Sequence, residues 1–335
     1  MNGAEVPYHL RPNKFVDRQL FVDVLARVGR LRDLSKYVYV SMGGKFLDDH
    51  LALHMALEVR ELISIDASPD VVARQDFNKP FESMKCLPKT AAEFVDEFSV
   101  FASEYPADTN FVVWLDYTDP KDRLLQLQEF SKLIAHCQPF DIVKITINAN
   151  IRTLRAEGQL PAGFPTVREW RLSIYQSQLG QFPGNATAEE MVQLHFPRVL
   201  ARSVAAAAKH GIETLRESTV RPLGVFVYSD GPHTMLSSTW IVLPEAEADS
   251  FMSERPIASW PFLAPSWEDV ARINVPDLST REKLHIDRLL LSKGDEEICQ
   301  SFGFFFGKNE TESIEQVSQY RRHYRFYPHF VRVSL

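Results

Sequence analysis

The feature that most constrains this chain is a β-favouring run that leads directly into two adjacent glycines. Residues 37–40 favour a strand, Ser41 and Met42 follow, and Gly43 and Gly44 come next. Apolar residues then recur at helical spacing, and a second apolar run ends on Asp66, 22 positions beyond Gly44. The order strand, glycine turn, helix, strand, acid predicts a nucleotide-binding βαβ unit.

The residue types in this unit suit a nucleotide. A residue without Cβ lets the backbone turn sharply and approach a ligand closely, and an acid at the tip of the second strand can bind both hydroxyls of a ribose. The full dinucleotide fingerprint has three spaced glycines, whereas here Ser41 stands in the first place and no residue supplies the third. Two glycines after a strand also fit an ordinary turn, so both interpretations stay open for this stretch alone.

Further along the chain, strands and helices keep alternating. Strands are expected at residues 84–87, 111–115 and 141–148, with helices at 90–105 and 121–137 between and after them. Five such alternations predict a doubly wound parallel sheet. Ligands bind outside the carboxyl ends of the strands in such sheets. The candidate site residues are therefore those at the strand ends: Ser41 to Gly44, Asp66, Asp116 to Asp119, and Asn148 with Asn150.

The second half of the chain predicts how the sheet ends. Helices are expected at residues 166–179 and 186–210. Strands at 223–229 and 235–243 flank the turn-forming Asp230-Gly231-Pro232, which predicts an antiparallel hairpin. We therefore expect an α/β fold, a Rossmann-like, mostly parallel sheet that ends in a hairpin. The expected domains are a helical segment at 1–32, the Rossmann-like domain at 33–244 with a helical insertion at 151–215, and a small C-terminal α+β lobe at 245–335.

Five βα units closed by a hairpin resemble the class I S-adenosylmethionine-dependent methyltransferases over residues 33–243. Three phrases are similar to bacterial proteins described as O-methyltransferases of unassigned substrate: Tyr-His-Leu-Arg-Pro-Asn-Lys, Ser-Met-Gly-Gly-Lys-Phe-Leu-Asp-Asp and Trp-Leu-Asp-Tyr-Thr-Asp-Pro. The resemblance implies S-adenosylmethionine as the cofactor. It places the loop of Ser41, Gly43 and Gly44 beneath the methionine part and Asp66 on the ribose hydroxyls. Asp116 and Tyr117 would lie beside the reactive methyl group.

Methyl transfer requires an aligned acceptor and, for a hydroxyl, removal of a proton. Asp116 is the candidate base, although an aspartate before Thr-Asp-Pro also suits a helix start with Asp119 as the N-cap. Arg11 and Lys14 stand where cations oppose the helix dipole, so we expect them to hold an anionic substrate, or else to form a solvated face with local ion pairs. Asn148, at the end of the fifth strand, is a further candidate for substrate binding.

Composition restricts the partners and the location. The net charge of −7 gives no overall attraction to nucleic acid, and three scattered cysteines without a CxxC pair fit a reducing compartment. The sequence has no apolar run long enough for a membrane span, and its N-terminus lacks the apolar region of a signal peptide. We therefore expect a cytoplasmic protein without a membrane partner. His50 and His54 lie four residues apart without an HExxH motif, and no metal is predicted.

Arginine and aromatic residues interleave near the C-terminus, in residues 320–333. Such a stretch suits stacking on bases, binding to phosphates or a protein interface. The first hypothesis is therefore a methyltransferase whose C-terminal lobe helps to select an unidentified hydroxyl or amine acceptor. The alternative is a non-catalytic module of the same fold that binds a protein or nucleic acid through this lobe. A nicotinamide-dependent oxidoreductase fits the hairpin and the missing third glycine less well.

Overall fold

A computed structural model of the chain describes residues 11–154 and 160–328. The described residues divide into two compact units. The larger one, called the sheet unit here, takes residues 21–227 and 233–271, and the smaller one, the C-terminal unit, takes 11–20, 228–232 and 272–328. Residues 245–271, assigned above to the C-terminal lobe, thus belong to the compact unit that holds the sheet.

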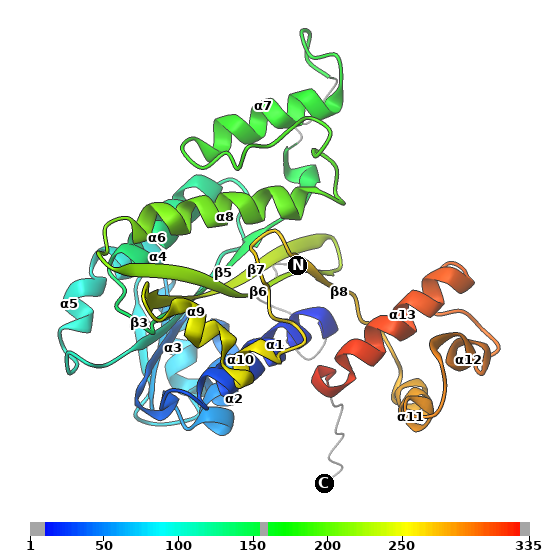
Figure 1. Cartoon of the computed structure of the whole chain (residues 1–335), viewed down its shortest axis with the longest axis horizontal. Helices are drawn as coiled ribbons and strands as arrows, with labels where there is room; N and C mark the ends of the chain where they lie inside the picture. Colours follow the sequence, from blue (N-terminus) through cyan, green and yellow to red (C-terminus); the bar gives the residue numbers. More distant parts are fainter. Residues whose placement is uncertain (1–10, 155–159, 329–335) are drawn as a thin grey trace. The chain divides into compact units, whose positions relative to one another are not determined.

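The sheet has eight strands in the order β3-β2-β1-β4-β5-β7-β6-β8 (Figure 1). The strands are β1 (Val38–Ser41), β2 (Glu61–Asp66), β3 (Lys85–Pro88), β4 (Phe111–Asp116), β5 (Ile142–Asn148), β6 (Ser218–Asp230), β7 (His233–Pro244) and β8 (Ala271–Ile273). The first five pair in parallel, and β7 lies antiparallel to β5. The predicted α/β fold, a mostly parallel sheet that ends in a hairpin, is confirmed.

Helices follow the strands of the sheet unit in alternation, as Figure 1 shows. They are α2 (Asp48–Leu57), α3 (Pro69–Asn78), α4 (Ala91–Asp96), α5 (Phe98–Ala102), α6 (Arg123–Ala135), α7 (Val167–Leu179), α8 (Phe196–Ile212), α9 (Ala248–Ser253) and α10 (Arg255–Ala258). Short 3-10 turns are η2 (Leu34–Lys36), η3 (Gly44–Phe46) and η4 (Ile151–Leu154). Helix α1 (Pro12–Val28) precedes them.

Two predicted helix starts are wrong. The helix expected from residue 186 begins at Phe196 with a proline in its first turn, and the residues before it form turns. Asp119 is not an N-cap, because α6 begins at Arg123 after Asp122. The Asp119 carboxylate instead accepts a hydrogen bond of 2.9 Å from the backbone N–H of Lys121, which makes a local turn before the helix.

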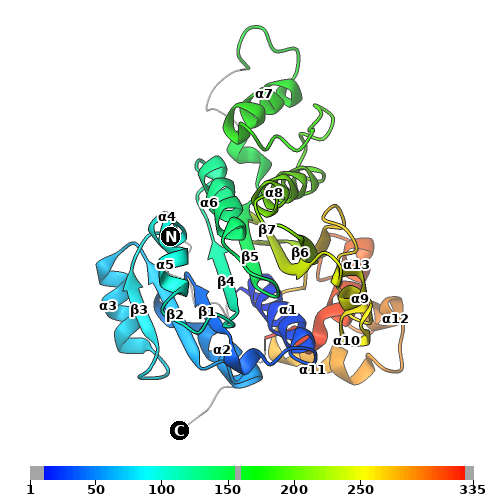
Figure 2. The same cartoon turned by 60° about the vertical axis from the view of Figure 1, so that its left-hand side comes forward.

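One face of the sheet is apolar and supports the core. Side chains such as Val113, Leu115 and Ile145 belong to a large buried cluster that also includes residues of α6 and α8. Figure 2 shows these two helices side by side. Their close approach depends on Gly211 of α8, where a Cβ would lie 2.3 Å from the carbonyl oxygen of Ser131 in α6.

The C-terminal unit contains α11 (Thr280–Leu289), α12 (Asp295–Gln300), α13 (Glu310–His323) and the 3-10 turn η5 (Tyr324–Phe326). Helix α11 begins with a capping box formed by Ser279 and Glu282. Part of the arginine and aromatic stretch joins the helices of this unit. Arg321 of α13 donates to the Asp295 carboxylate of α12 at 2.6 Å, and Tyr320 of α13 donates to Asp287 of α11 at 2.7 Å. Residues 329–333 of that stretch lie outside the described part of the chain.

Candidate active site

The site lies at the carboxyl end of β1, which pairs with β2 on one side and β4 on the other. The strand order reverses here, because the chain proceeds from β1 toward β3 and then returns to β4. Adjacent connections leave this point in opposite directions, which opens a crevice in parallel sheets. The glycine turn therefore lies where a nucleotide ligand is expected.

Two contacts explain why the turn needs its glycines. A Cβ on Gly43 would lie only 2.6 Å from Cε1 of His50, whose ring is fully buried. The Gly43 N–H donates to Ser64 Oγ at 3.3 Å, which ties the turn to β2. Gly44 has a φ of +56°, in the left-handed region that favours glycine.

Ser41, the last residue of β1, connects the strand before this turn to the helix after it. Its hydroxyl donates to the Asp49 carboxylate of α2 at 2.5 Å, and the Tyr39 hydroxyl donates to the same oxygen at 2.6 Å. Ser41 is also buried. The residue that stands in place of the first glycine of the dinucleotide fingerprint therefore links β1 to α2 through its hydrogen bond. Neither Tyr39 nor Asp49 was predicted to belong to the site. The only sequence signal for Asp49 is that it ends the phrase that starts at Ser41.

Asp66 stands beside the glycine turn. Ser64 of β2 aligns with Ser41 of β1, so Asp66, two residues further along, lies level with Gly43. One carboxylate oxygen of Asp66 accepts from the backbone N–H of Ser68 at 2.8 Å, just before α3 begins. This bond orients a half-buried carboxylate that has further acceptor capacity for ribose hydroxyls.

The structure separates Asp116 from Tyr117. Successive residues of an extended strand point to opposite faces, and Tyr117 is buried in the apolar core beneath α6. Its hydroxyl donates to the Glu129 carboxylate of α6, and burial raises the pKa of Tyr117 well above 10. Asp116 is half-buried at the end of β4 on the other face, level with Thr146 of β5.

Asn148 ends β5 and is bonded to Arg123, a residue that was not predicted to belong to the site. The Arg123 guanidinium of α6 is fully buried and donates to the backbone carbonyl of Asn148 at 3.0 Å. It also donates to Thr153 Oγ1 at 2.6 Å and to Gln178 of α7 at 3.2 Å. Burial lowers the pKa of Arg123 to about 10. One arginine thus joins the end of β5 to the helical insertion.

Arg11 and Lys14 belong to the C-terminal unit, at the start of α1. Lys14 is buried, and its backbone N–H donates to the Asp230 carboxylate at 2.8 Å. The other Asp230 oxygen accepts from the backbone N–H of Asn13 at 3.2 Å. A carboxylate therefore supplies the negative charge that favours a helix N-terminus, beside the cations noted in the sequence.

His50 and His54 each form a hydrogen bond with a backbone carbonyl group. His50 lies within 2.9 Å of the Ile63 carbonyl oxygen, and His54 within 2.9 Å of the Val59 carbonyl oxygen. Within residues 11–154 and 160–328 there is no group of three or more side chains suited to hold a metal ion. None of the helices in the same ranges is both long enough and apolar enough to cross a membrane.

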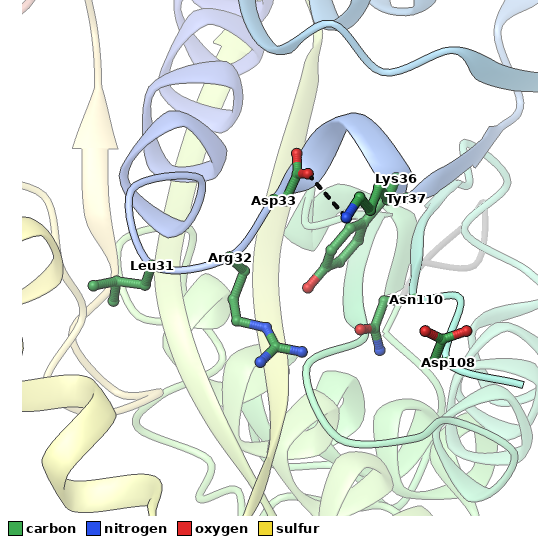
Figure 3. A pocket seen from close by; sticks show the side chains of 7 residues that line it. All are labelled: Leu31, Arg32, Asp33, Lys36, Tyr37, Asp108 and Asn110. Atoms are coloured by element: carbon green, nitrogen blue, oxygen red, sulfur yellow. Dashed lines mark ion pairs between the residues drawn. The ribbon is translucent and has the colours of Figure 1, made fainter.

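A cavity of about 290 Å³ lies at the other end of the central strands, at their amino ends (Figure 3). Its lining comes from the residues just before β1 and β4: Leu31, Arg32, Asp33, Lys36, Tyr37, Asp108 and Asn110. Lys36 and Asp33 form an ion pair of 3.5 Å there, and burial raises the pKa of Tyr37 to about 12. The cavity is at the amino ends of the strands, so it is separate from the glycine turn.

The strand order, the antiparallel β7, the glycine turn after β1 and the acid after β2 together define a Rossmann-like fold of the methyltransferase type. The sequence profile of the family described as "Putative O-methyltransferase" matches residues 6–335. The chain belongs to this family.

The solved structures that match this chain at low identity include methyltransferases. The N-methyltransferase NodS from Bradyrhizobium japonicum WM9 is 10% identical, with 68% of this chain and 97% of that chain covered and a TM-score of 0.36. The O-methyltransferase TomG from Streptomyces achromogenes, in complex with SAM, is 10% identical, with 67% of this chain and 79% of that chain covered and a TM-score of 0.35.

LepI in complex with SAM is 11% identical, with 65% of this chain covered and a TM-score of 0.32. This chain spans 46% of the length of that LepI chain. No curated protein sequence matches the chain.

Proposed function

We propose that this chain transfers a methyl group from S-adenosylmethionine to a hydroxyl oxygen of its acceptor. The observation that carries the proposal is the alignment of the Gly43–Gly44 turn with Asp66, at the point where the strand order reverses. Membership of the O-methyltransferase family supports it. The residues fit the cofactor, because the turn has no Cβ that would obstruct a close ligand and Asp66 offers acceptors to two ribose hydroxyls.

Each residue has a role that follows from its position. Asp66 binds the ribose, and the backbone of Gly43 and Gly44 lies against the methionine part. The bound cofactor supplies an electrophilic methyl group on a sulfonium. Asp116, half-buried at the end of β4 on the face away from α6, takes the proton of the acceptor hydroxyl as its oxygen gains the methyl group. Tyr117 supports this strand end through its bond to Glu129 and needs no contact with substrate.

Calorimetric titration with S-adenosylhomocysteine tests the cofactor site, with NAD as the control ligand. Loss of one or two hydrogen bonds in Asp66→Ala should weaken binding by about 1–3 kcal/mol. Asp70→Ala, which removes a nearby exposed acid of α3, is the matched control and should bind like the wild type. No saturable binding of S-adenosylhomocysteine to the wild type would overturn the proposed function.

The role of Asp116 is tested separately. Asp116→Asn keeps the shape of the side chain but cannot accept a proton, so it should bind S-adenosylhomocysteine as the wild type does and turn over at least 100-fold more slowly. The assay measures S-adenosylhomocysteine formed from S-adenosylmethionine in the presence of an acceptor. Unchanged turnover would exclude Asp116 as the base.

A further inference from the structure

The sheet face that carries Asp116 has several polar side chains near the carboxyl ends of β4 and β5, in contrast to the apolar face beneath α6 and α8. Asp116 of β4 aligns with Thr146 of β5, and Thr146 aligns with Ser237 of β7. Aligned residues of neighbouring strands point to the same face, so these three side chains form a line across the sheet. We call this line the polar row. It begins at the proposed base and runs away from the cofactor turn.

Ser237 is the unusual member of the polar row. It is fully buried, and its hydroxyl oxygen has no hydrogen-bond partner among the residues that the structure describes. Buried polar side chains nearly always have a partner, so a hydroxyl left without one suggests that a ligand supplies the partner. The buried serines nearer the glycine turn differ, since Ser41 donates to Asp49 and Ser64 accepts from Gly43.

A hydrogen bond to the hydroxyl of Thr146 favours this residue as a hydrogen-bond donor beside Ser237. Its Oγ1 accepts a hydrogen bond of 2.9 Å from the Trp114 indole N–H. Because one lone pair of that oxygen is engaged, the Thr146 hydroxyl proton points elsewhere and can be donated. The indole therefore favours Thr146 as a donor to a ligand beside Ser237.

The surroundings of the polar row contain further hydrogen-bond donors. Lys144, on the same face of β5, is buried with its ammonium 4.3 Å from the centre of the Trp114 ring and 4.7 Å from that of Phe21. Asn148, two residues beyond Thr146, contributes a side-chain amide at the strand end. Apart from Asp116, these groups are hydrogen-bond donors or can act as donors.

We propose that Thr146 and Ser237 bind a second oxygen of the methyl acceptor, one that accepts hydrogen bonds. Neighbouring strands lie about 4.8 Å apart, so this oxygen would be roughly 5–10 Å from the hydroxyl at Asp116. That separation is the length of one aromatic ring with a substituent. The acceptor class is therefore an aromatic hydroxy acid or hydroxy ketone, whose hydroxyl is methylated while its carboxylate or carbonyl stays on the polar row.

The reaction on such an acceptor balances without another reagent. The hydroxyl proton passes to Asp116, the acceptor oxygen forms a bond to the methyl carbon, and the sulfur–methyl bond breaks with its electron pair on sulfur. The acceptor carboxylate is unchanged. The inference rests on the proposed function, since it assigns the acceptor of the same site.

The experiment titrates 4-hydroxybenzoate into the full chain saturated with S-adenosylhomocysteine and follows binding by calorimetry. Phenol has the same ring and hydroxyl without the second oxygen, so it measures what that oxygen contributes. We expect 4-hydroxybenzoate to bind at least tenfold more tightly than phenol. The two probes are also compared as acceptors with S-adenosylmethionine.

Two variants locate the effect. Ser237→Ala should weaken 4-hydroxybenzoate about tenfold, the cost of one hydrogen bond to a charged group, and leave phenol unchanged. Ser238→Ala is the matched control, because Ser238 is a neighbouring buried serine that aligns with Ile145 on the apolar face. It should leave both probes unchanged. Thr146→Val should weaken 4-hydroxybenzoate in the same way as Ser237→Ala.

Stability in urea distinguishes a ligand-binding hydroxyl from a structural one. Removal of a buried hydroxyl that lacks a partner should not lower the unfolding midpoint of Ser237→Ala without ligand, whereas a structural hydroxyl would. Equal binding of the two probes, binding of neither, or equal effects of the two serine variants would overturn the inference. Failure of the proposed function is distinguished by the first titration, in which the wild type would not bind S-adenosylhomocysteine at all.

Discussion

Gly43→Ala is the most direct test of how the glycine turn is built. The φ of Gly43 is −66°, which alanine adopts readily, so the backbone itself is not the obstacle. The added Cβ would lie 2.6 Å from Cε1 of His50 and 2.9 Å from Cδ2 of Leu47, against ordinary contacts of 3.4–4 Å. His50 cannot rotate away easily, because its ring is fully buried and bound to the Ile63 carbonyl oxygen.

The turn or the histidine must therefore shift by roughly 1 Å, and overpacking of this kind typically costs about 1–3 kcal/mol. Urea unfolding should show that loss, and calorimetry should show weaker binding of S-adenosylhomocysteine. Gly294→Ala is the control, since the nearest atom to its Cβ would be a flexible glutamate oxygen at 3.8 Å.

A double-mutant cycle identifies the cause. His50→Ala removes the ring that the new Cβ would meet, so Gly43→Ala should cost less in that background than in the wild type. If Gly43→Ala unfolds at the wild-type urea concentration and binds S-adenosylhomocysteine normally, the described contact between the turn and His50 is refuted.

Two further predictions concern other parts of the chain. Arg123→Met should leave the carbonyl of Asn148 without its donor and lower the free energy of unfolding by about 1–3 kcal/mol, whereas Arg198→Met at an exposed position of α8 should have little effect in the same urea assay. Burial lowers the pKa of His323 to about 4, below its ordinary 6.5, so the unfolded chain takes up the proton first as the pH falls. The free energy of unfolding should therefore decrease by about 3 kcal/mol between pH 7 and pH 4 through this group. A wild-type chain and His323→Leu that lose equal stability in acid would contradict this.

The sequence predicted the order of elements because that order depends on local signals. Apolar runs such as residues 111–115 specify strands without knowledge of their neighbours, and Gly43 and Gly44 mark a turn wherever they occur. The hairpin followed from turn residues between two β-favouring runs. Helix starts were less certain, as Asp119 and the residues before Phe196 show, because several nearby residues can begin a helix equally well.

The placement of Asp66 beside the glycine turn also followed from the sequence. It required only that two strands separated by one helix pair in parallel, which is the usual outcome for such a unit. The partners of individual side chains could not be predicted in this way. Nothing near Tyr117 in the sequence indicates that its hydroxyl bonds to Glu129 on the core side rather than lying beside Asp116.

The sequence by itself thus determined the fold class, the glycine turn and the acid after β2. Only the tertiary structure decided which side chains share a face, because strand register brings residues together regardless of their separation in the chain. Ser237 lies 91 positions after Thr146, yet the antiparallel pairing of β7 with β5 aligns the two. A register shift of one residue would turn Ser237 toward the apolar core and Ser238 toward Asp116. The polar row is therefore a consequence of the folded sheet.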